Sequence, residues 1–335
     1  MPRVIAAIAA LAVLGVVPAQ AAGPARPKGD AAKLAAEKAR RAGVPNVRLP
    51  RGGGEAPITL PTTVTAGPDG TSWFVDDTNG SSGPFSGTCD GTPALGIVDA
   101  GSSDSGDAYD NAYPLWVNGT IFTVGTTVDL TGTTMTAGPL AMSGLNVTRE
   151  LFFSPTRQVM RVLDSFQNPG GGPINVTVEI PINFGSDGGT IVQATSSGDT
   201  TFTVADRWLI TSDSGPSDPV NTTVLYGPGT PALTPASVTV TVFDCAATNG
   251  AGWTFNLSVP AGATRRLLYF AGLEDMVTGT NTVAGAQANV VVFNDVLVLN
   301  STTDLLSGLT VPQLLEIANW DMTPVPVELQ SFEVE

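Results

Sequence analysis

The chain has 335 residues, of which 15 are basic and 30 are acidic, with two cysteines, no histidine and a net charge of −15. Hydrophobic residues make up 42% of the chain, which excludes an acidic disordered tail, and two cysteines are too few for a disulfide-stapled miniprotein. Richness in Thr, Val, Gly and Pro excludes a helical bundle, and the lack of histidine excludes catalytic triads and metal sites that need it.

Residues 1–21 have the pattern of an export signal. A basic start at Arg3 precedes a mostly apolar run over 4–17, and the small-x-small sequence at 19–21 predicts cleavage before Ala22. The apolar run is shorter than a membrane span usually requires, although an uncleaved N-terminal anchor is the alternative. We therefore expect a secreted, extracellular or cell-surface protein with no transmembrane segment in the mature chain.

Residues 22–54 are predicted to form a basic leader, with a helix over 31–42 and a flexible glycine joint at 52–54. Residues 22–51 contain eight basic and two acidic residues, a charge of +6, whereas residues 52–335 contain six arginines and 28 acidic residues, a charge of −22. An acidic body should repel nucleic acid and anionic lipid. The leader is interpreted as a solvated arm; the alternatives are that it binds nucleic acid, anionic lipid or a neighbour's acidic body.

The body, residues 55–320, is predicted to be all-β. Apolar and polar residues alternate with a period of two in several runs, which is typical of half-buried strands in an antiparallel sheet. Clusters of Gly, Pro, Asn, Asp and Ser separate these runs and indicate turns. The fold class expected is one large antiparallel β-sandwich with a short N-terminal helix and a short C-terminal helix. The clearest alternating runs are 176–182, 238–242 and 253–259.

The C-terminal part contains the best-marked helix of the chain. Thr310 and Gln313 form a capping box with Pro312 in the first turn, so a helix is expected from there to about Asn319. Residues 284–299 are ambiguous, because their first half favours a helix and their second half a strand. Residues 321–335 are predicted to be a C-terminal strand or tail, with one slip in the alternation that suggests a bulge.

Several short segments of the body carry a resemblance to known proteins. They are 107–110 (DAYD), 145–149 (LNVTR), 160–164 (MRVLD), 168–169 (NP), 183–188 (NFGSDG), 194–200 (ATSSGDT) and 206–208 (DRW). These segments resemble sandwich modules of secreted bacterial proteins that are themselves similar to the β-supersandwich domain of carbohydrate-active enzymes. The resemblance covers roughly residues 70–320 and implies a fold and an exported location, without a catalytic signature. The final segment 326–332 (PVELQSF) is similar to segments that end secreted bacterial proteins or join their modules.

Two groups of residues are candidates for a disulfide and for a metal site. Cys89 and Cys245 are expected to form a disulfide in an exported protein; the alternative is two free thiols. Acidic residues cluster in the first part of the body, where oxygen ligands in loops would suit Ca²⁺. The alternative is a solvated acidic surface. The carboxylates proposed for calcium are Asp76, Asp77, Asp104, Asp107 and Asp110.

The sequence shows no catalytic residue that we would assign. Glu150, Glu179 and Glu274 are the available glutamates for acid–base chemistry, and the first two are interpreted as solvent-facing strand residues. Among the tryptophans, Trp116 and Trp208 are the candidates for stacking on a sugar ring, although most tryptophans should lie in the core.

Three hypotheses of function remain. The first is a non-enzymatic structural or adhesive protein at the cell surface, possibly self-assembling through the basic leader and the C-terminal strand. The second is a carbohydrate-binding module with a surface polysaccharide as its partner. The third is a polysaccharide-cleaving enzyme that uses carboxylates.

Overall fold

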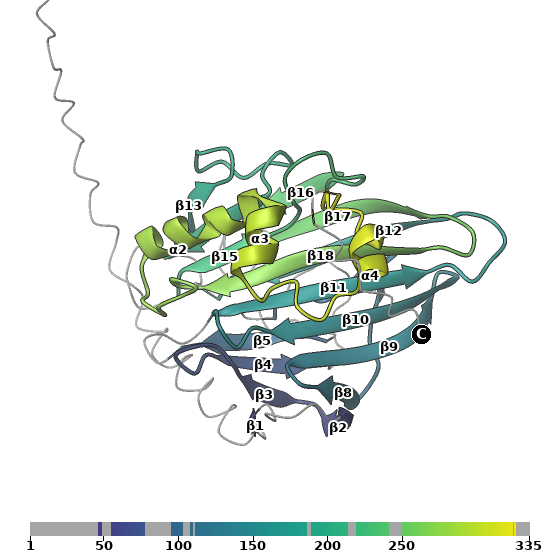
Figure 1. The fold of residues 1–335 in the computed structure, drawn as a ribbon, viewed down its shortest axis with the longest axis horizontal. Helices are drawn as coiled ribbons and strands as arrows, with labels where there is room; N and C mark the ends of the chain where they lie inside the picture. Colours follow the sequence, from purple (N-terminus) through teal and green to yellow (C-terminus); the bar gives the residue numbers. More distant parts are fainter. Residues whose placement is uncertain are drawn as a thin grey trace, which may run out of the picture.

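The computed structural model describes residues 46–48, 55–77, 95–102, 108–109, 111–185, 189–213, 219–240, 250–323 and 325. These residues form three β-sheets and a layer of short helices (Figure 1). Only β1 and β3 pair in parallel among the strand pairs described. The predicted all-β fold built from large antiparallel sheets is therefore confirmed.

A nine-stranded sheet forms the centre of the molecule, and every neighbouring pair in it is antiparallel. The order is β13-β14-β15-β18-β11-β10-β9-β8-β2, so strands far apart in the chain lie side by side. The strands are β2 (Glu55–Thr59), β8 (Thr127–Thr131), β9 (Thr134–Met142), β10 (Leu145–Phe153), β11 (Val159–Gln167), β13 (Ile191–Thr195), β14 (Trp208–Ser212), β15 (Asn221–Val224) and β18 (Thr264–Leu273).

The middle strand of this sheet, β11, and its neighbour β18 are buried on both faces. In β18, Leu267 and Tyr269 belong to the main core, whereas Leu268 and Phe270 point to the opposite face and belong to a second core. Successive side chains of a strand alternate between faces, so a continuous apolar run is needed where both faces are covered. This explains the apolar run in β18, whereas β11 also buries Arg161 and Asp164, which are hydrogen-bonded to Leu305 O and to Arg149.

A five-stranded sheet packs on one face of the nine-stranded sheet and completes the sandwich. Phe255 and Leu257 point into the core, and Asn256 and Ser258 point outward, as the alternation in 253–259 predicts. The strand order is β16-β17-β12-β6-β7. The strands are β6 (Trp116–Val117), β7 (Thr120–Ile121), β12 (Ile174–Asn183), β16 (Ser237–Val240) and β17 (Gly250–Val259).

A four-stranded sheet lies beside the sandwich, in the order β1-β3-β4-β5 (Figure 1). It consists of β1 (Asn46–Arg48), β3 (Thr62–Thr65), β4 (Ser72–Asp76) and β5 (Gly96–Gly101). Strand β1 comes from the segment that the sequence assigns to the leader, and it pairs with β3. That part of the leader is therefore a strand. The remainder of the leader and the export signal lie outside the described residues.

Helices α2 (Val283–Val290), η2 (Val291–Asn294), α3 (Val296–Thr302) and α4 (Val311–Glu316) cover the other face of the nine-stranded sheet (Figure 1). Their buried side chains, including Phe293 and Leu299, form the second core with Leu268 and Phe270. The ambiguous segment 284–299 is thus helical, and Asp295 caps α3 by accepting hydrogen bonds from the backbone N–H groups that follow it. The capping box predicted for α4 is present, although the helix ends at Glu316.

Among the described residues, no single helix combines the length and apolar character that a membrane span needs. The segments 283–294 and 296–302 reach that length and composition only together, and they are bent by 109° relative to one another.

Candidate functional site

The acidic residues proposed for calcium are only partly described. Asp77 follows β4, and its Oδ2 atom accepts hydrogen bonds from the backbone N–H groups of Val124 and Gly125, both at 2.6 Å. Burial raises the pKa of Asp77, and these hydrogen bonds oppose that rise. Asp76 ends β4 beside it. Within the described residues, no group of three or more acidic side chains is placed to hold a metal ion.

The remaining residues of these two predictions lie outside the described part of the chain. Asp104, Asp107 and Asp110 lie there, as do Cys89 and Cys245. The calcium site and the disulfide therefore stay predictions.

The two tryptophans expected to stack on a sugar are buried. Trp116 in β6 is 4% exposed, and Trp208 in β14 is 8% exposed. Trp208 packs in the second core beneath the helices, and its Nε1 atom donates a hydrogen bond to Asn294 Oδ1 at 3.0 Å. A stacking platform needs an open ring face. Neither ring has one, so the structure does not support these two residues as a platform.

The three glutamates do not converge. Glu150 in β10 points toward the helix side of the nine-stranded sheet, because its neighbours Arg149 and Leu151 point into the sandwich. Glu179 in β12 points outward from the other sheet, because Val178 and Ile180 point inward. Two carboxylates that cleave a glycosidic bond must lie about 5–10 Å apart across one cleft. Glu150 and Glu179 face opposite sides of the sandwich and cannot form such a pair.

Glu274 lies at the end of β18 and is fully buried, with a backbone φ of 55°. Its Oε1 atom accepts a hydrogen bond from the hydroxyl of Ser102 at 2.7 Å. A non-glycine residue in this left-handed region is held there by its surroundings. The residue therefore fixes the end of the strand to the segment after β5.

Glu179 lies on the outer face of its sheet but is partly buried there, and this partial burial has a testable consequence for stability. Burial raises the pKa of Glu179. A carboxyl group whose pKa is higher in the folded state destabilises that state at neutral pH, and this cost disappears as the pH falls below the unfolded pKa. We expect Glu179→Gln to raise the urea midpoint at pH 7 and to leave it unchanged near pH 3. A change of equal size at both pH values would contradict this expectation.

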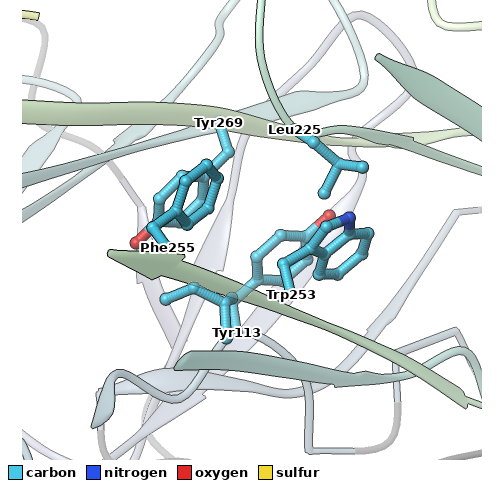
Figure 2. Close-up of a pocket in the computed structure, with 6 residues that line it drawn as sticks. Tyr113, Leu225, Trp253, Phe255 and Tyr269 are labelled. Carbon is cyan, nitrogen blue, oxygen red and sulfur yellow. The ribbon is translucent and has the colours of Figure 1, made fainter. Parts of the chain in front are cut away.

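An aromatic cavity lies inside the sandwich, between β12, β17 and β18 (Figure 2). The rings of Tyr113 and Tyr269 stack there with their centroids 6.1 Å apart. Its volume is about 10 Å³, which is room for one water molecule. The cavity is therefore too small for a substrate. Its lining consists of Tyr113, Ile180, Leu225, Trp253, Phe255 and Tyr269.

A larger pocket, which we call the edge pocket, opens where the β13–β14 edge of the nine-stranded sheet faces the ends of β12 and β17. Its volume is about 450 Å³, within the range of sites for small ligands. Its lining contains aliphatic and aromatic side chains, threonines and a glycine, and no charged residue among the described ones. These residues are Phe184, Thr190, Ile191, Val192, Thr200, Thr201, Phe202, Leu209, Thr211, Gly250 and Ala251.

One wall of the edge pocket contains an aromatic contact, and its rim is exposed. Phe202 is held by an edge-to-face contact with Trp253, with ring centroids 5.8 Å apart. Ile191 on β13 lies at the rim and is 43% exposed. Thr211 on β14 is 1% exposed, and its buried hydroxyl has no hydrogen-bond partner among the described residues. The pocket thus combines apolar walls with a hydroxyl that needs a partner.

The candidates named from the sequence do not include any residue of the edge pocket. Those candidates are tryptophans, carboxylates and cysteines, whereas the pocket is lined by phenylalanines, threonines and aliphatic residues. The only local signal is the run Thr200-Thr201-Phe202-Thr203, which does not alternate as a strand would.

No family model matches the chain, and no curated protein matches it. Among solved structures, it is similar to a galactose mutarotase-like protein from Lactobacillus casei ATCC 334, with 11% identity over 63% of this chain and 100% of that one, at a TM-score of 0.40. It is also similar to a putative aldose 1-epimerase from Klebsiella pneumoniae subsp. pneumoniae MGH 78578, with 10% identity over 82% of this chain and 96% of that one, at a TM-score of 0.35. A galactose mutarotase related enzyme from Lactobacillus acidophilus shares 8% identity over 66% of this chain and 100% of that one, at a TM-score of 0.33.

These comparisons correct the first hypothesis of function. All three proteins are named for sugar chemistry, and none of the three is named as a structural or adhesive protein. The prediction of a non-enzymatic structural or adhesive protein is therefore wrong. At identities of 8–11% and TM-scores of 0.33–0.40 the likeness concerns the fold alone, so the ligand has to be argued from the pocket itself.

Proposed function

We propose that the chain is a carbohydrate-binding protein and that the edge pocket holds a neutral sugar unit. The observation that supports this proposal is the uncharged lining, in which apolar walls alternate with threonine hydroxyls. Sugars present apolar C–H faces together with hydroxyls that both donate and accept hydrogen bonds. A pocket with mostly apolar walls and a few polar groups is suited to such a ligand.

Each part of the lining has a role in this proposal. Phe184 and Phe202 are 3% and 8% exposed but border the pocket, so they would supply apolar wall contacts to the sugar and not an open stacking platform. Thr190 and Thr211 would bind its hydroxyls. A χ1 rotation of Thr211 would turn its buried hydroxyl toward the ligand and supply the partner it lacks among the described residues.

The charge of the chain argues for a neutral ligand. No basic side chain is among the described lining residues, and residues 52–335 carry a net charge of −22. An anionic sugar would be repelled by this field and would find no partner for its charge in the pocket. We also propose that the protein is exported and that the sugars it binds are extracellular. This proposal rests on the signal pattern at residues 1–21.

The experiment compares two exposed aliphatic residues of the same kind. Ile191 lines the edge pocket at 43% exposure, and Val204 lies outside it at 44%. We expect saturation-transfer NMR with glucose, galactose, mannose and xylose to detect binding by the wild type. Ile191→Arg should fill the pocket and weaken binding by at least about tenfold, a loss of about 1.4 kcal/mol. Val204→Arg, the matched control, should bind as the wild type does.

Two outcomes would contradict the proposal. One is a wild-type chain that binds none of these sugars. The other is equal binding by Ile191→Arg and Val204→Arg, because the sugar would then lie elsewhere on the molecule.

A further inference from the structure

A second uncharged recess lies on the outer face of the five-stranded sheet, and we call it the amide groove. Its volume is about 260 Å³. It crosses β12 and β17 and ends at the turn between β6 and β7. Its lining consists of Asn118, Asn175, Val176, Thr177, Asn256, Leu257 and Ser258.

The register of the strands brings the polar side chains of the groove together. Asn175 lies opposite Ser258, and Thr177 lies opposite Asn256. Side chains directly opposite one another on an antiparallel pair have Cβ atoms about 4.5–5.5 Å apart. Asn118 is fixed at the end of the groove, because its Oδ1 accepts a hydrogen bond from Thr177 N and its N donates one to Thr177 O, both at 2.8 Å.

Asparagine is an unusual choice for these positions. Surface positions within strands favour threonine, valine and aromatic residues, and asparagine is depleted there. Asn175 and Asn256 are both exposed, and neither side chain makes a hydrogen bond to another described residue. They therefore give the fold no visible support, although each has a free donor and a free acceptor.

The surroundings of the groove decide which ligand it suits. Along the groove β12 and β17 pair with each other, so the lining presents side chains on a sheet face and no backbone edge between these two strands. A nucleic acid would find no basic partner among the described lining residues, and Glu179 lies next to Thr177 on the same face of β12. Amides and hydroxyls on a rigid surface match the hydroxyls of a neutral oligosaccharide.

We propose that the amide groove is a second carbohydrate-binding site, for a neutral oligosaccharide, separate from the edge pocket. Gly250 and Ala251 of β17 line the edge pocket, whereas Asn256 and Ser258 of the same strand line the groove. At about 3.3 Å per residue the two sites lie on the order of 20 Å apart along the strand. One sugar unit cannot reach both, so each site can be lost without the other.

The test uses the full chain with Ile191→Arg, which blocks the edge pocket, and titrates it with cellohexaose, xylohexaose and mannohexaose by calorimetry. We expect this variant to bind at least one hexasaccharide. Adding Asn175→Thr and Asn256→Thr should weaken that binding by at least about tenfold. Threonine suits a strand, so the fold should be kept, and circular dichroism checks this. The control is Asn300→Ala, which removes an exposed amide from α3 and should leave binding unchanged.

Three results would overturn the inference. The first is the loss of all hexasaccharide binding in Ile191→Arg alone. The second is binding that the two threonine substitutions leave intact. The third is stronger binding of a twelve-nucleotide RNA than of any hexasaccharide. The inference stands, and the proposed function of the edge pocket fails, if Ile191→Arg leaves monosaccharide binding unchanged while the threonine substitutions abolish hexasaccharide binding.

Discussion

Arg149→Met is expected to lower the free energy of unfolding by about 3–5 kcal/mol, because it leaves the charge of Asp164 buried without its partner. Both side chains are fully buried, and Arg149 Nε donates to Asp164 Oδ1 at 2.8 Å. The guanidinium also donates to the backbone oxygens of Leu95 and Tyr113 and to the hydroxyl of Tyr269. One side chain thus joins β10, β11 and β18 to the segments that precede β5 and β6.

Urea unfolding of the wild type, of Arg149→Met and of the double variant Arg149→Met with Asp164→Leu checks this expectation. The double variant removes both charges, so it should recover part of the loss. Recovery should stay incomplete, because the carbonyl groups of Leu95 and Tyr113 lose their donor in both variants. A loss below about 1 kcal/mol in the single variant would contradict the role given to this ion pair.

The strands and the last helix could be predicted because their signals are local. Alternation over 253–259 shows which side chains of β17 face the core, and the structure confirms it. The capping box at Thr310 marks the start of α4, since its hydrogen bonds join residues only three apart. Segment 284–299 was ambiguous because apolar runs such as Val290–Phe293 suit a strand as well as a buried helix. The segment forms helices because its apolar side chains pack on the apolar face of the nine-stranded sheet, which the local sequence does not show.

The candidate sites could not be predicted because they depend on pairing between distant strands. The edge pocket joins Phe184, Thr211 and Gly250, which no spacing rule connects. The amide groove depends on the register that places Thr177 opposite Asn256, and sequence alone shows only that Asn256 faces outward. Trp208 was a candidate for stacking on a sugar ring, and the sequence does not show that the helices packed over β14 bury it. Arg149 and Glu150 are adjacent charged residues of one strand, and the sequence does not show which face of the sheet each of them occupies. The structure places Arg149 in the core of the sandwich and Glu150 on the helix side of the sheet.

Gly227→Ala is expected to cost about 3 kcal/mol through a direct clash with Trp320. A Cβ atom at position 227 would lie 2.3 Å from Cε3 of the indole. The ring cannot move away, because Nε1 donates to Leu268 O at 2.8 Å and the ring meets Phe270 edge-to-face with centroids 5.6 Å apart. Overpacking of a well-packed core costs about 1–3 kcal/mol, and a contact this close falls at the upper end.

Gly171→Ala is the matched control, because no atom lies within 4 Å of its added Cβ. It should leave stability unchanged or raise it by up to about 1 kcal/mol, since alanine restricts the unfolded chain. Equal urea midpoints for the two alanine variants would contradict the clash.

The indole can be tested as the cause by removing it. Trp320→Ala alone should cost about 3–5 kcal/mol, because a large side chain that is only 2% exposed leaves a cavity in the second core. In that background the methyl group at position 227 has space, so Gly227→Ala should then cost less than about 1 kcal/mol. The coupling energy between the two substitutions should therefore reach about 2 kcal/mol. Additive losses would mean that Gly227 is required by the backbone of its loop, and the clash would be excluded as the cause.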